Sequence, residues 1–354
     1  MDAPLRIGLV GYGLSGSVFH APLYRAAGVE LVAVASSDAD KVRADHPRVR
    51  VHPSPEALFA DADVELAVLA TPTPTHAPLM LAAIAAGKHV LSDKPFCATL
   101  EEADAVVAAA DAAGRVVSCY QNRRHDADFL TLRRLIEDGV LGEIVRYEAW
   151  FDRFSPAVRD RWQERDAPGV GIHYDLGAHL VDQALLLFGR PDWVQGDLQR
   201  LRAGADPRSG IVDAFHVRMA RGATRIELSA SMSVPDHRLR YRVQGTRGAW
   251  FKEHLDPQES QLRHEGLAAD DARYGVEPET HHGTLTTIED GRPSSRRVAT
   301  ERGDWPRFYR ELAAAVREGR PPPVTAREAR ETIRVIEAIA LSSATGRRVV
   351  PEGD

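Results

Sequence analysis

The sequence predicts an α/β protein with a doubly wound parallel sheet at its N-terminus, followed by an α+β domain with a large, open, mostly antiparallel sheet. Three observations lead to this prediction. Short apolar runs alternate with helical segments over the first third of the chain, which is typical of βαβ units. A glycine-rich turn, residues 11–16, follows the first apolar run. Beyond residue 122, apolar and polar residues alternate with a period of two, as in half-buried antiparallel strands.

In the N-terminal part we predict five strands whose residues are nearly all apolar, because a parallel sheet is covered on both faces. They lie at residues 5–10, 30–35, 64–70, 89–92 and 116–120. Helices between them are predicted at residues 15–27, 76–86 and 100–113. Right-handed crossovers through these helices produce a doubly wound sheet.

In the remainder of the chain, helical and alternating segments are mixed. A helix is predicted at 129–138, and strands are predicted at 143–152, 211–219, 224–232 and 238–244. Residues 256–303 are polar, with scattered Gly and Pro, and predict long loops. Asp304 can cap a helix over 305–318, and Thr325 with Glu328 forms a capping box for a helix that runs to about residue 343.

Composition limits the classes of function. The chain has 354 residues, enough for two domains, and a net charge of −6, without the basic patch of a nucleic-acid-binding protein. No apolar stretch is long enough to span a membrane, and the first residues lack a secretion-signal pattern. The two cysteines, Cys97 and Cys119, are far apart and fit a reducing compartment. We therefore expect a cytoplasmic protein that binds neither nucleic acid nor membranes.

The glycine-rich turn matches the dinucleotide-binding pattern G-x-G-x-x-G. Its residues are Gly11, Tyr12, Gly13, Leu14, Ser15 and Gly16. The first glycine permits a tight turn, the second lets the backbone approach a pyrophosphate, and the third lets the following helix pack on the strand. Because the pattern follows a buried strand and opens a helix, we predict a Rossmann domain that binds a nicotinamide cofactor.

The end of the second strand predicts which nicotinamide cofactor is preferred. NAD-binding proteins usually have an acidic residue there, which binds the ribose 2′-hydroxyl. Here that position is Ser36, followed by Ser37, which leaves room for a 2′-phosphate, and Lys41 can help to neutralise it. NADP(H) is therefore favoured. NAD(H) remains possible, because a shift of register at the strand end would bring Asp38 nearer to the ribose.

Lys94 is a candidate catalytic residue. Only four of the 45 basic residues are lysines, and unlike Arg, a Lys can lose its proton when its pKa is lowered. Asp93, Lys94 and Pro95 follow the fourth predicted strand, at the edge where ligands bind in open α/β sheets. Pro95 restricts the conformation of Lys94, and a cis peptide bond between them would fix the direction of the side chain.

A second candidate catalytic group lies in a predicted helix. Asp175 and His179 are four residues apart and would share one helix face, so that the carboxylate can orient the imidazole. Histidine is the usual group for moving a proton near neutral pH. His173 could suggest a metal site together with these two residues, but it precedes the helix and no Cys or Glu is near. We expect no metal.

These residues together resemble the Gfo/Idh/MocA family of oxidoreductases over essentially the whole chain. The resemblance is carried by residues 11–16, Thr71 to His76, Ala86 to Val90, Asp93 to Pro95, and Asp175 with His179. Further segments resemble a narrower branch that contains bacterial NADP-dependent scyllo-inositol dehydrogenases. These segments are residues 19–22, 121–130, 151–154 and 161–162.

The resemblance implies a dinucleotide-binding domain at 1–121, a substrate-binding and oligomerisation domain at 122–324, and a C-terminal helix at 325–354 that packs back near the first domain. It implies catalytic roles for Lys94, Asp175 and His179. The residues expected to bind the cofactor are those of the turn at 11–16 with Ser36, Ser37, Lys41, Thr71, Pro72, Thr73, His76, Asp93, Lys94, Asn122, Arg161 and Trp162. Those expected to bind substrate are Lys94, Asn122, Arg123, Trp162, His173, Tyr174, Asp175 and His179.

The expected reaction is hydride transfer between NADP(H) and a secondary alcohol or ketone of a cyclic polyol or sugar. The expected assembly is a homodimer or homotetramer formed through the C-terminal sheet. Several alternatives stay open: an NADP-binding regulator without activity, an aldose dehydrogenase, redox-assisted glycoside cleavage, or reduction of an imine or biliverdin-type substrate. Arg123 and Arg124 could instead be surface charges at the start of a helix.

Overall fold

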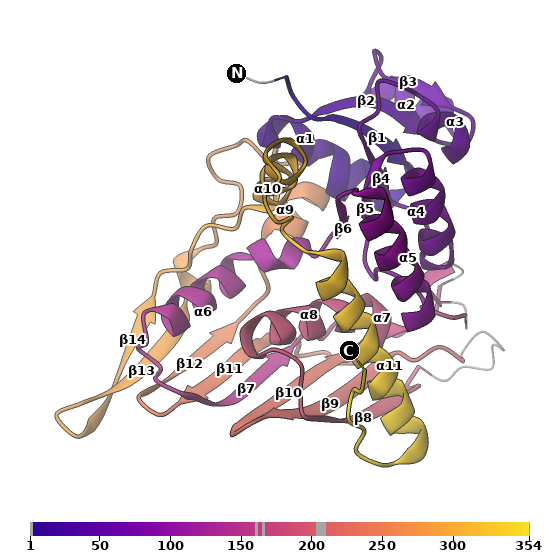
Figure 1. Cartoon of the computed structure of the whole chain (residues 1–354). Helices are drawn as coiled ribbons and strands as arrows, with labels where there is room; N and C mark the ends of the chain where they lie inside the picture. The colour runs from indigo at the N-terminus through magenta and orange to yellow at the C-terminus, as the bar shows by residue number, and fades with distance from the viewer. Residues whose placement is uncertain (1–2, 160–161, 165–166, 203–209, 354) are drawn as a thin grey trace. The chain divides into compact units, whose positions relative to one another are not determined.

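The computed structural model describes residues 3–159, 162–164, 167–202 and 210–353 (Figure 1). The chain forms two compact units. The first contains residues up to Asn122 with Gln258–Tyr274 and Asp304–Arg330. The second contains Arg123–Pro257, Gly275–Gly303 and the residues from Glu331 onward. Each unit is built around one sheet.

The first unit has a six-stranded parallel sheet in the order β3-β2-β1-β4-β5-β6. The strands are β1 (Arg6–Val10), β2 (Glu30–Ala35), β3 (Arg50–His52), β4 (Leu66–Leu69), β5 (His89–Ser92) and β6 (Val117–Cys119). Val10 pairs with Ala35 on one side and with Leu69 on the other, so β1, β2 and β4 end at the same height in the sheet. The strand order reverses between β1 and β4, where doubly wound sheets bind ligands at the carboxyl edge. The predicted doubly wound fold is confirmed.

The strands of this sheet form because their residues are apolar on both faces; all four residues of β4, for example, are buried. The helices of the unit are α1 (Ala21–Ala27), α2 (Ala39–Asp45), α3 (Pro55–Phe59), α4 (His76–Ala85), α5 (Leu100–Ala113), α9 (Gln258–Arg263) and α10 (Trp305–Glu318). Asp304 caps α10, as predicted, by accepting a hydrogen bond from the main-chain N–H of Arg307.

The helix predicted at residues 15–27 is in fact two helical segments. A π-helical segment, η1 (Ser15–His20), comes first, and the N–H of Ala21 donates to the carbonyl of Gly16 five residues earlier. The regular helix α1 follows. Pro22 accounts for the change, because it has no N–H and its ring clashes with the carbonyl four residues earlier in a regular α-helix.

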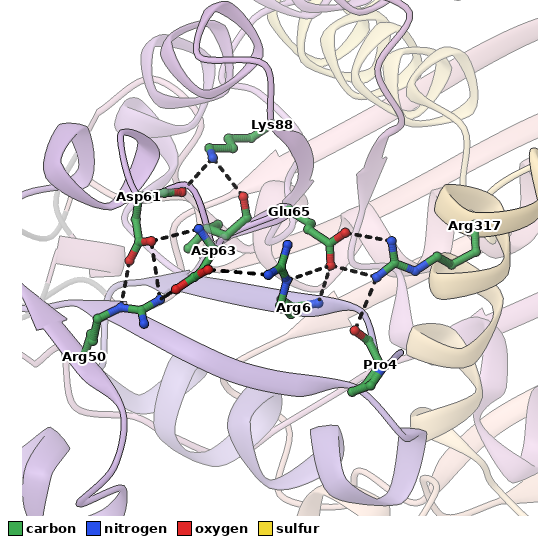
Figure 2. Close-up of polar contacts among 9 residues, drawn as sticks. Pro4, Arg6, Arg50, Asp61, Asp63, Glu65, Lys88 and Arg317 are labelled. Carbon is green, nitrogen blue, oxygen red and sulfur yellow. Dashed lines mark hydrogen bonds and ion pairs between the residues drawn. The ribbon is translucent and has the colours of Figure 1, made fainter. Parts of the chain in front are cut away.

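At the amino edge of the first sheet, a charged network joins segments that are distant in sequence (Figure 2). Its members are Arg6, Arg50, Asp61, Asp63, Glu65, Lys88 and Arg317. Both Glu65 oxygens accept from Arg317 at 2.7 Å, and Oε2 also accepts from Arg6. Arg317 lies in α10 and Glu65 directly precedes β4, so this pair fastens the helix to the sheet.

The second unit has an eight-stranded sheet in the order β14-β13-β12-β11-β7-β10-β9-β8. The strands are β7 (Ile144–Trp150), β8 (Trp193–Gln199), β9 (Ala214–Arg221), β10 (Thr224–Ser231), β11 (Leu239–Gly245), β12 (Gly248–Glu253), β13 (Gly283–Glu289) and β14 (Arg292–Val298). Only the β7 and β10 pair is parallel. The predicted open, mostly antiparallel sheet is confirmed.

Helices cover one face of this sheet. They are α6 (Ala127–Glu137), α7 (Ile172–Asp175), α8 (Gly177–Phe188) and the part of α11 (Ala326–Thr345) from Glu331 onward. Phe129, Leu180 and Ile336 from these helices pack with Tyr147 and Val217 of the sheet. Among the described residues of the second unit, no helix lies on the opposite face (Figure 1). Within the described ranges, no helix is long and apolar enough to cross a membrane.

The prediction of long loops over 256–303 is wrong. This segment contains α9 and the hairpin of β13 and β14. The sequence of β14 is polar on both sides of the strand and includes Pro293, so it has no apolar alternation to detect. Its pairing with β13 rests on main-chain hydrogen bonds, and its position at the edge of the sheet tolerates both the proline and the charges.

Candidate active site

The first candidate site lies at the carboxyl edge of the six-stranded sheet. Because the strands are parallel, the turns that follow β1, β2, β4 and β5 all emerge at this edge. They carry the glycine-rich turn, Ser36, Thr71 to Thr73 and Asp93 to Lys94. The structure therefore brings these predicted cofactor-binding segments to one edge of one sheet.

The glycines of the turn have different physical roles. Gly11 has a φ of 91°, and a Cβ there would lie 2.5 Å from the carbonyl oxygen of Ala70. A Cβ on Gly16 would lie 2.2 Å from the carbonyl oxygen of Gly11. Packing within the protein therefore requires both glycines. A Cβ on Gly13 would meet no atom of the described residues within 4 Å apart from its chain neighbours, so this glycine leaves open space that a pyrophosphate could approach.

Two side chains flank the glycines. Tyr12 is buried, and its hydroxyl donates to Asp45 at 2.9 Å; burial and this carboxylate raise the pKa of Tyr12. Leu14 is 50% exposed, although leucine is normally buried. An exposed apolar side chain in this turn is available for contact with a ligand.

Ser36 and Asp38, which follow β2, have different contacts. Ser36 directly follows the strand, and Ser37 after it is exposed. Asp38 caps α2: its Oδ1 accepts from the N–H of Lys41 at 3.0 Å, while its own N–H donates to Ser36 Oγ at 3.1 Å. Lys41 Nζ donates to the carbonyl oxygen of Tyr12 at 3.1 Å, which places a cation beside the glycine-rich turn.

The turn after β4 contains a buried hydroxyl. Thr73 is 1% exposed, and its Oγ1 has no hydrogen-bond partner among the described residues. Its neighbour Thr71 accepts a hydrogen bond from Thr75 on Oγ1 at 2.8 Å. Burying an unpartnered hydroxyl is costly, so an external partner would stabilise this turn.

His76 connects two turns of the site. Its ring is buried, with Nε2 at 2.8 Å from the carbonyl oxygen of Thr71 and Nδ1 at 2.8 Å from that of Pro95. Both ring nitrogens are therefore engaged with the main chain. His76 holds the turns after β4 and β5 together.

Asp93 and Lys94 form the turn after β5, and the Lys94–Pro95 peptide bond is cis. Asp93 Oδ1 accepts from the N–H of Lys94 at 2.7 Å, and Oδ2 accepts from Ser15 Oγ at 2.5 Å. Burial raises the pKa of Asp93, but the nearby imidazole of His20, the charge of Lys94 and the Ser15 hydroxyl outweigh it and hold the pKa well below its usual range. Asp93 is therefore an anion at neutral pH.

This edge fits a dinucleotide. The gap at Gly13, the unpartnered Thr73 hydroxyl and the N-terminus of η1 all suit a phosphate-containing ligand. Among the described side chains, no group of three or more His, Cys, Asp or Glu is arranged to hold a metal ion.

The second unit carries the other predicted catalytic residues. Asp175 ends α7 and is exposed, whereas His179 lies in the first turn of α8 and is 6% exposed. The single helix predicted here is thus two segments, which meet at Leu176 with right-handed helical angles. Lys94 belongs to the first unit, and Asp175 and His179 belong to the second.

His173 is a buried, neutral histidine. Burial, with a smaller effect from the charge of Arg200, lowers the pKa of His173 to about 4. Its Nδ1 has no hydrogen-bond partner among the described residues, and its ring lies 4.7 Å from that of Tyr174. Gly171 allows this packing: it has a φ of 109°, and a Cβ there would lie 2.8 Å from the imidazole.

The interpretation of Arg123 and Arg124 as surface charges is wrong. Arg124 forms two hydrogen bonds with Asp182, at 2.7 and 2.8 Å, and is buried. Arg123 is also buried, donates to Asp126 at 3.1 Å and lies over the ring of Phe151 at 4.7 Å. Local sequence could not indicate this, because Asp182 is 58 residues away from Arg124.

Asp152 is a buried acid that the sequence did not single out by itself, although it lies in the segment 151–154 that marks the narrower branch. It is 8% exposed, and its Oδ1 has no hydrogen-bond partner among the described residues. Burial raises the pKa of Asp152 to about 6, and a main-chain hydrogen bond from Ser231 and the charge of His237 offset this only in part.

The remaining predicted residues are placed as follows. Asn122 is buried at the end of the first unit, and Trp162 is half-buried in the short helix η4 (Trp162–Glu164). Arg161 lies outside the described residues.

Comparison with known proteins identifies the family. Residues 5–121 match the oxidoreductase family model for an NAD-binding Rossmann fold, and residues 133–351 match the model for its C-terminal alpha/beta domain. The chain is 42% identical to the uncharacterized oxidoreductase YdgJ of Escherichia coli, over 98% of each chain. It is 36% identical to scyllo-inositol 2-dehydrogenase (NADP(+)) IolW of Bacillus subtilis, over 98% of this chain and 96% of that one.

A solved structure agrees with these matches. The structure of yvaA from Bacillus subtilis superposes with a TM-score of 0.94 at 36% identity, covering 99% of this chain and 100% of that one. Both family models and the glycine-rich turn lead to the same conclusion. The chain belongs to the Gfo/Idh/MocA family of oxidoreductases and has an NAD(P)-binding Rossmann domain.

Proposed function

We propose that the protein is an NADP(H)-dependent dehydrogenase that interconverts a secondary alcohol and a ketone on a cyclic polyol or sugar, with scyllo-inositol or a close relative as substrate. The observation that carries the proposal is the arrangement at the carboxyl edge of the first sheet, where the glycine-rich turn and Lys94 follow parallel strands. The similarity to IolW, named as an NADP-dependent scyllo-inositol 2-dehydrogenase, supports the substrate class.

The preference for NADP(H) rests on the end of β2. The 2′-phosphate would lie beside Ser36 and Ser37, which carry no charge to repel it, with Lys41 nearby as a cation. Asp38 is engaged in capping α2, so its carboxylate is not directed at a ribose 2′-hydroxyl. The other residues proposed to bind the cofactor are Tyr12, Gly13, Leu14, Ser15, Thr71, Pro72, Thr73, Asp93, Asn122, Arg161 and Trp162, with His76 holding the turns.

When bound, the nicotinamide ring supplies hydride chemistry, and the protein supplies position and charge. We propose that Lys94 Nζ and His179 handle the proton of the alcohol, with a cationic Lys94 stabilising negative charge on the oxygen. Asp175 would orient His179. Asn122, Arg123, Trp162, His173 and Tyr174 would bind the other hydroxyl groups of the substrate.

We further propose that the protein forms a homodimer or homotetramer through the helix-free face of the eight-stranded sheet. Tyr147 and Ala149 of β7 point into the core, so their neighbours Arg146 and Glu148 face the other way. Phe251 is 38% exposed. Light scattering coupled to size exclusion would give two or four times the mass of the 38.8 kDa chain. A monomeric mass at micromolar concentration would contradict the proposed assembly.

The test of the function is the absorbance of the reduced nicotinamide, with NADP and NAD supplied in parallel against a panel of inositols, aldoses and other polyols. NADP-dependent reduction with scyllo-inositol or a relative is expected. Activity only with NAD would overturn the proposed cofactor preference. No turnover with any substrate, alongside tight NADP binding, would overturn the activity and favour a regulator.

A further inference from the structure

His20 is a buried histidine that the proposed reaction does not use. It ends the π-helical segment η1. Its side chain is fully buried. A buried ring nitrogen without a hydrogen-bond partner calls for a physical explanation.

The partners of His20 come from other elements of the same unit. Nδ1 lies 2.5 Å from the hydroxyl of Tyr309 in α10, 289 residues away in sequence. Nε2 lies 3.7 Å from Oδ2 of Asp93, just after β5, which is close enough for a charge interaction but longer than a hydrogen bond, and Nε2 has no hydrogen-bond partner among the described residues. The ring also packs against that of Tyr120, with 4.3 Å between the centroids.

These partners determine the tautomer. A lone pair on Nε2 would face the negative carboxylate of Asp93, so Nε2 must carry the proton. A neutral imidazole then has its lone pair on Nδ1, which accepts the hydrogen bond from the Tyr309 hydroxyl. Tyr309 thus fixes His20 as a donor directed at Asp93.

Asp93 also accepts hydrogen bonds from two parts of the proposed cofactor site. Oδ2, the oxygen near His20, accepts from Ser15 of the glycine-rich turn, and Oδ1 accepts from the N–H of Lys94. The position of the carboxylate therefore influences both the glycine-rich turn and the main chain at Lys94. Without His20, the carboxylate would keep the hydrogen bonds from Ser15 and Lys94 but lose the imidazole beside Oδ2.

We propose that His20 is a positioning residue: together with Tyr309 it forms a buried Tyr–His–Asp relay that fixes Asp93, and through Asp93 it aligns Lys94 with the glycine-rich turn. The catalytic part of this inference rests on the proposed role of Lys94. The titratable groups that face His20 are Asp93, Tyr120 and Tyr309, with Tyr24 packed on Tyr309 at 4.9 Å between ring centroids. Burial raises the pKa of Tyr24 and that of Tyr309, so these two hydroxyls stay neutral and act as hydrogen-bonding groups.

Two substitutions at His20 separate its two contacts. The amide nitrogen of Gln in His20→Gln can occupy the place of Nε2 and keep a donor toward Asp93. The shorter Asn in His20→Asn can occupy the place of Nδ1 and loses the reach to Asp93. If the relay acts through Asp93, His20→Gln should keep kcat within about threefold of wild type, and His20→Asn should lower kcat on the order of 10–100-fold with little change in the KM for the polyol. Equal kcat values for the two variants would overturn the proposal.

A third variant and a matched control distinguish the proposed effect on kcat from a simple loss of folding. Tyr309→Phe removes only the hydroxyl that fixes the tautomer, and should lower kcat several-fold. His89→Asn replaces a histidine at the opposite end of β5, whose Nδ1 accepts from the N–H of Val116, and should leave kcat unchanged. A loss of kcat in His89→Asn as large as in His20→Asn would overturn the catalytic part of the proposal, because the loss would then not depend on the contact with Asp93.

The relay also has a readout that needs no substrate. Nitrogen-15 NMR of the histidine rings, with the His20 signals assigned by their loss in His20→Gln, reports which nitrogen carries the proton. Protonated Nε2 and unprotonated Nδ1 are expected in wild type, with a mixture in Tyr309→Phe. Protonated Nδ1 in wild type would overturn the relay. If no polyol is turned over, the proposed function fails, while the ring signals still decide the proposed relay.

Discussion

The four lysines show why a rare residue type is retained at particular positions. Lys41, Lys88 and Lys252 each direct Nζ at main-chain carbonyl oxygens: Tyr12 for the first, Asp61 and Val64 for the second, and Glu253 and His254 for the third. Lys252 also forms a buried ion pair with Glu277 at 2.8 Å. A compact ammonium with three donors satisfies the several acceptors around Lys88 and Lys252 better than a planar guanidinium. The scarcity of lysine therefore indicated special positions, but at these two the reason is the geometry of the polar contacts.

At the residue scale, the first prediction concerns cofactor preference. Ser36→Asp introduces a carboxylate where a 2′-phosphate would lie, and creates an acceptor for a ribose hydroxyl. The ratio of kcat/KM for NADP to that for NAD should fall on the order of 10–100-fold, measured by initial rates with each cofactor.

Asp38→Asn is the matched control for this substitution, because Asn also caps helices well and removes only the charge. It should leave the cofactor ratio close to that of wild type. A large change in Asp38→Asn, with none in Ser36→Asp, would mean that Asp38 faces the ribose.

The second prediction at this scale concerns Asp152 and pH. Its pKa is raised from 3.8 to about 6, so the folded protein binds more protons than the unfolded chain between those values, and stability falls as pH rises through this window. Asp152→Asn should therefore increase the free energy of unfolding at pH 7.5 by about 1–2 kcal/mol, and the gain should disappear toward pH 4.

Urea unfolding at pH 7.5 and 4.5 measures this effect. Asp40→Asn is the control, because that side chain is 97% exposed and its substitution should change stability by less than about 0.5 kcal/mol at either pH. A loss of stability in Asp152→Asn at pH 7.5 would show that the carboxylate is paired in solution.

At the element scale, the sequence predicted helices and strands wherever one pattern dominated. The helix over 100–113 and the helix over 305–318 were predicted with their observed limits, because each has a capping residue and a clear end. The strands β3, β8, β12, β13 and β14 were missed. Val194, Trp250 and Leu285 of β8, β12 and β13 do lie in the core. Each of these strands has too few buried apolar residues for a local pattern to reveal it, and the pairing with neighbouring strands cannot be seen in the local sequence.

For the candidate site too, the sequence predicted only the parts that have a local signature. The glycine-rich turn and the turn at Asp93 have local signatures, so their positions at the sheet edge followed from the strand pattern. The contacts of His20, His76 and Arg124 could not be predicted, since each joins segments that are distant in sequence. Neither local spacing nor composition contains that information.

The prediction at the element scale concerns the ion pair that joins α10 to the sheet. The hydrogen bonds of Arg317 are the main cause that lowers the pKa of Glu65 to about 2, against the effect of burial and with help from Arg6. A lowered pKa stabilises the fold above the unfolded value of about 4.5, and this stabilisation is lost as pH falls toward 2. Glu65→Gln should therefore cost about 2 kcal/mol at pH 7 and less at pH 3.5.

A double-mutant cycle of Glu65→Gln and Arg317→Met by urea unfolding tests whether the two side chains act together. A coupling energy of about 1–2 kcal/mol at pH 7 is expected for this bidentate ion pair. Strictly additive effects would mean that α10 is held by its apolar face alone.

At the scale of the whole molecule, the chain combines two sheets with different roles. The parallel sheet has the strand order and glycine-rich turn of a dinucleotide-binding domain. The second unit contains Asp175 and His179, which we propose act in the reaction, and the buried Asp152. The proposed reaction needs residues of both units, and Lys94 is the residue of the first unit that would act on the substrate oxygen.

The proposed role of Lys94 is tested by the initial rate of NADP reduction by Lys94→Ala with a polyol that wild type oxidises, with the NADPH affinity of both proteins measured by fluorescence. Turnover should fall by roughly 10³-fold or more, while NADPH affinity stays within about threefold of wild type. Turnover at the wild-type rate would contradict the proposed role of Lys94.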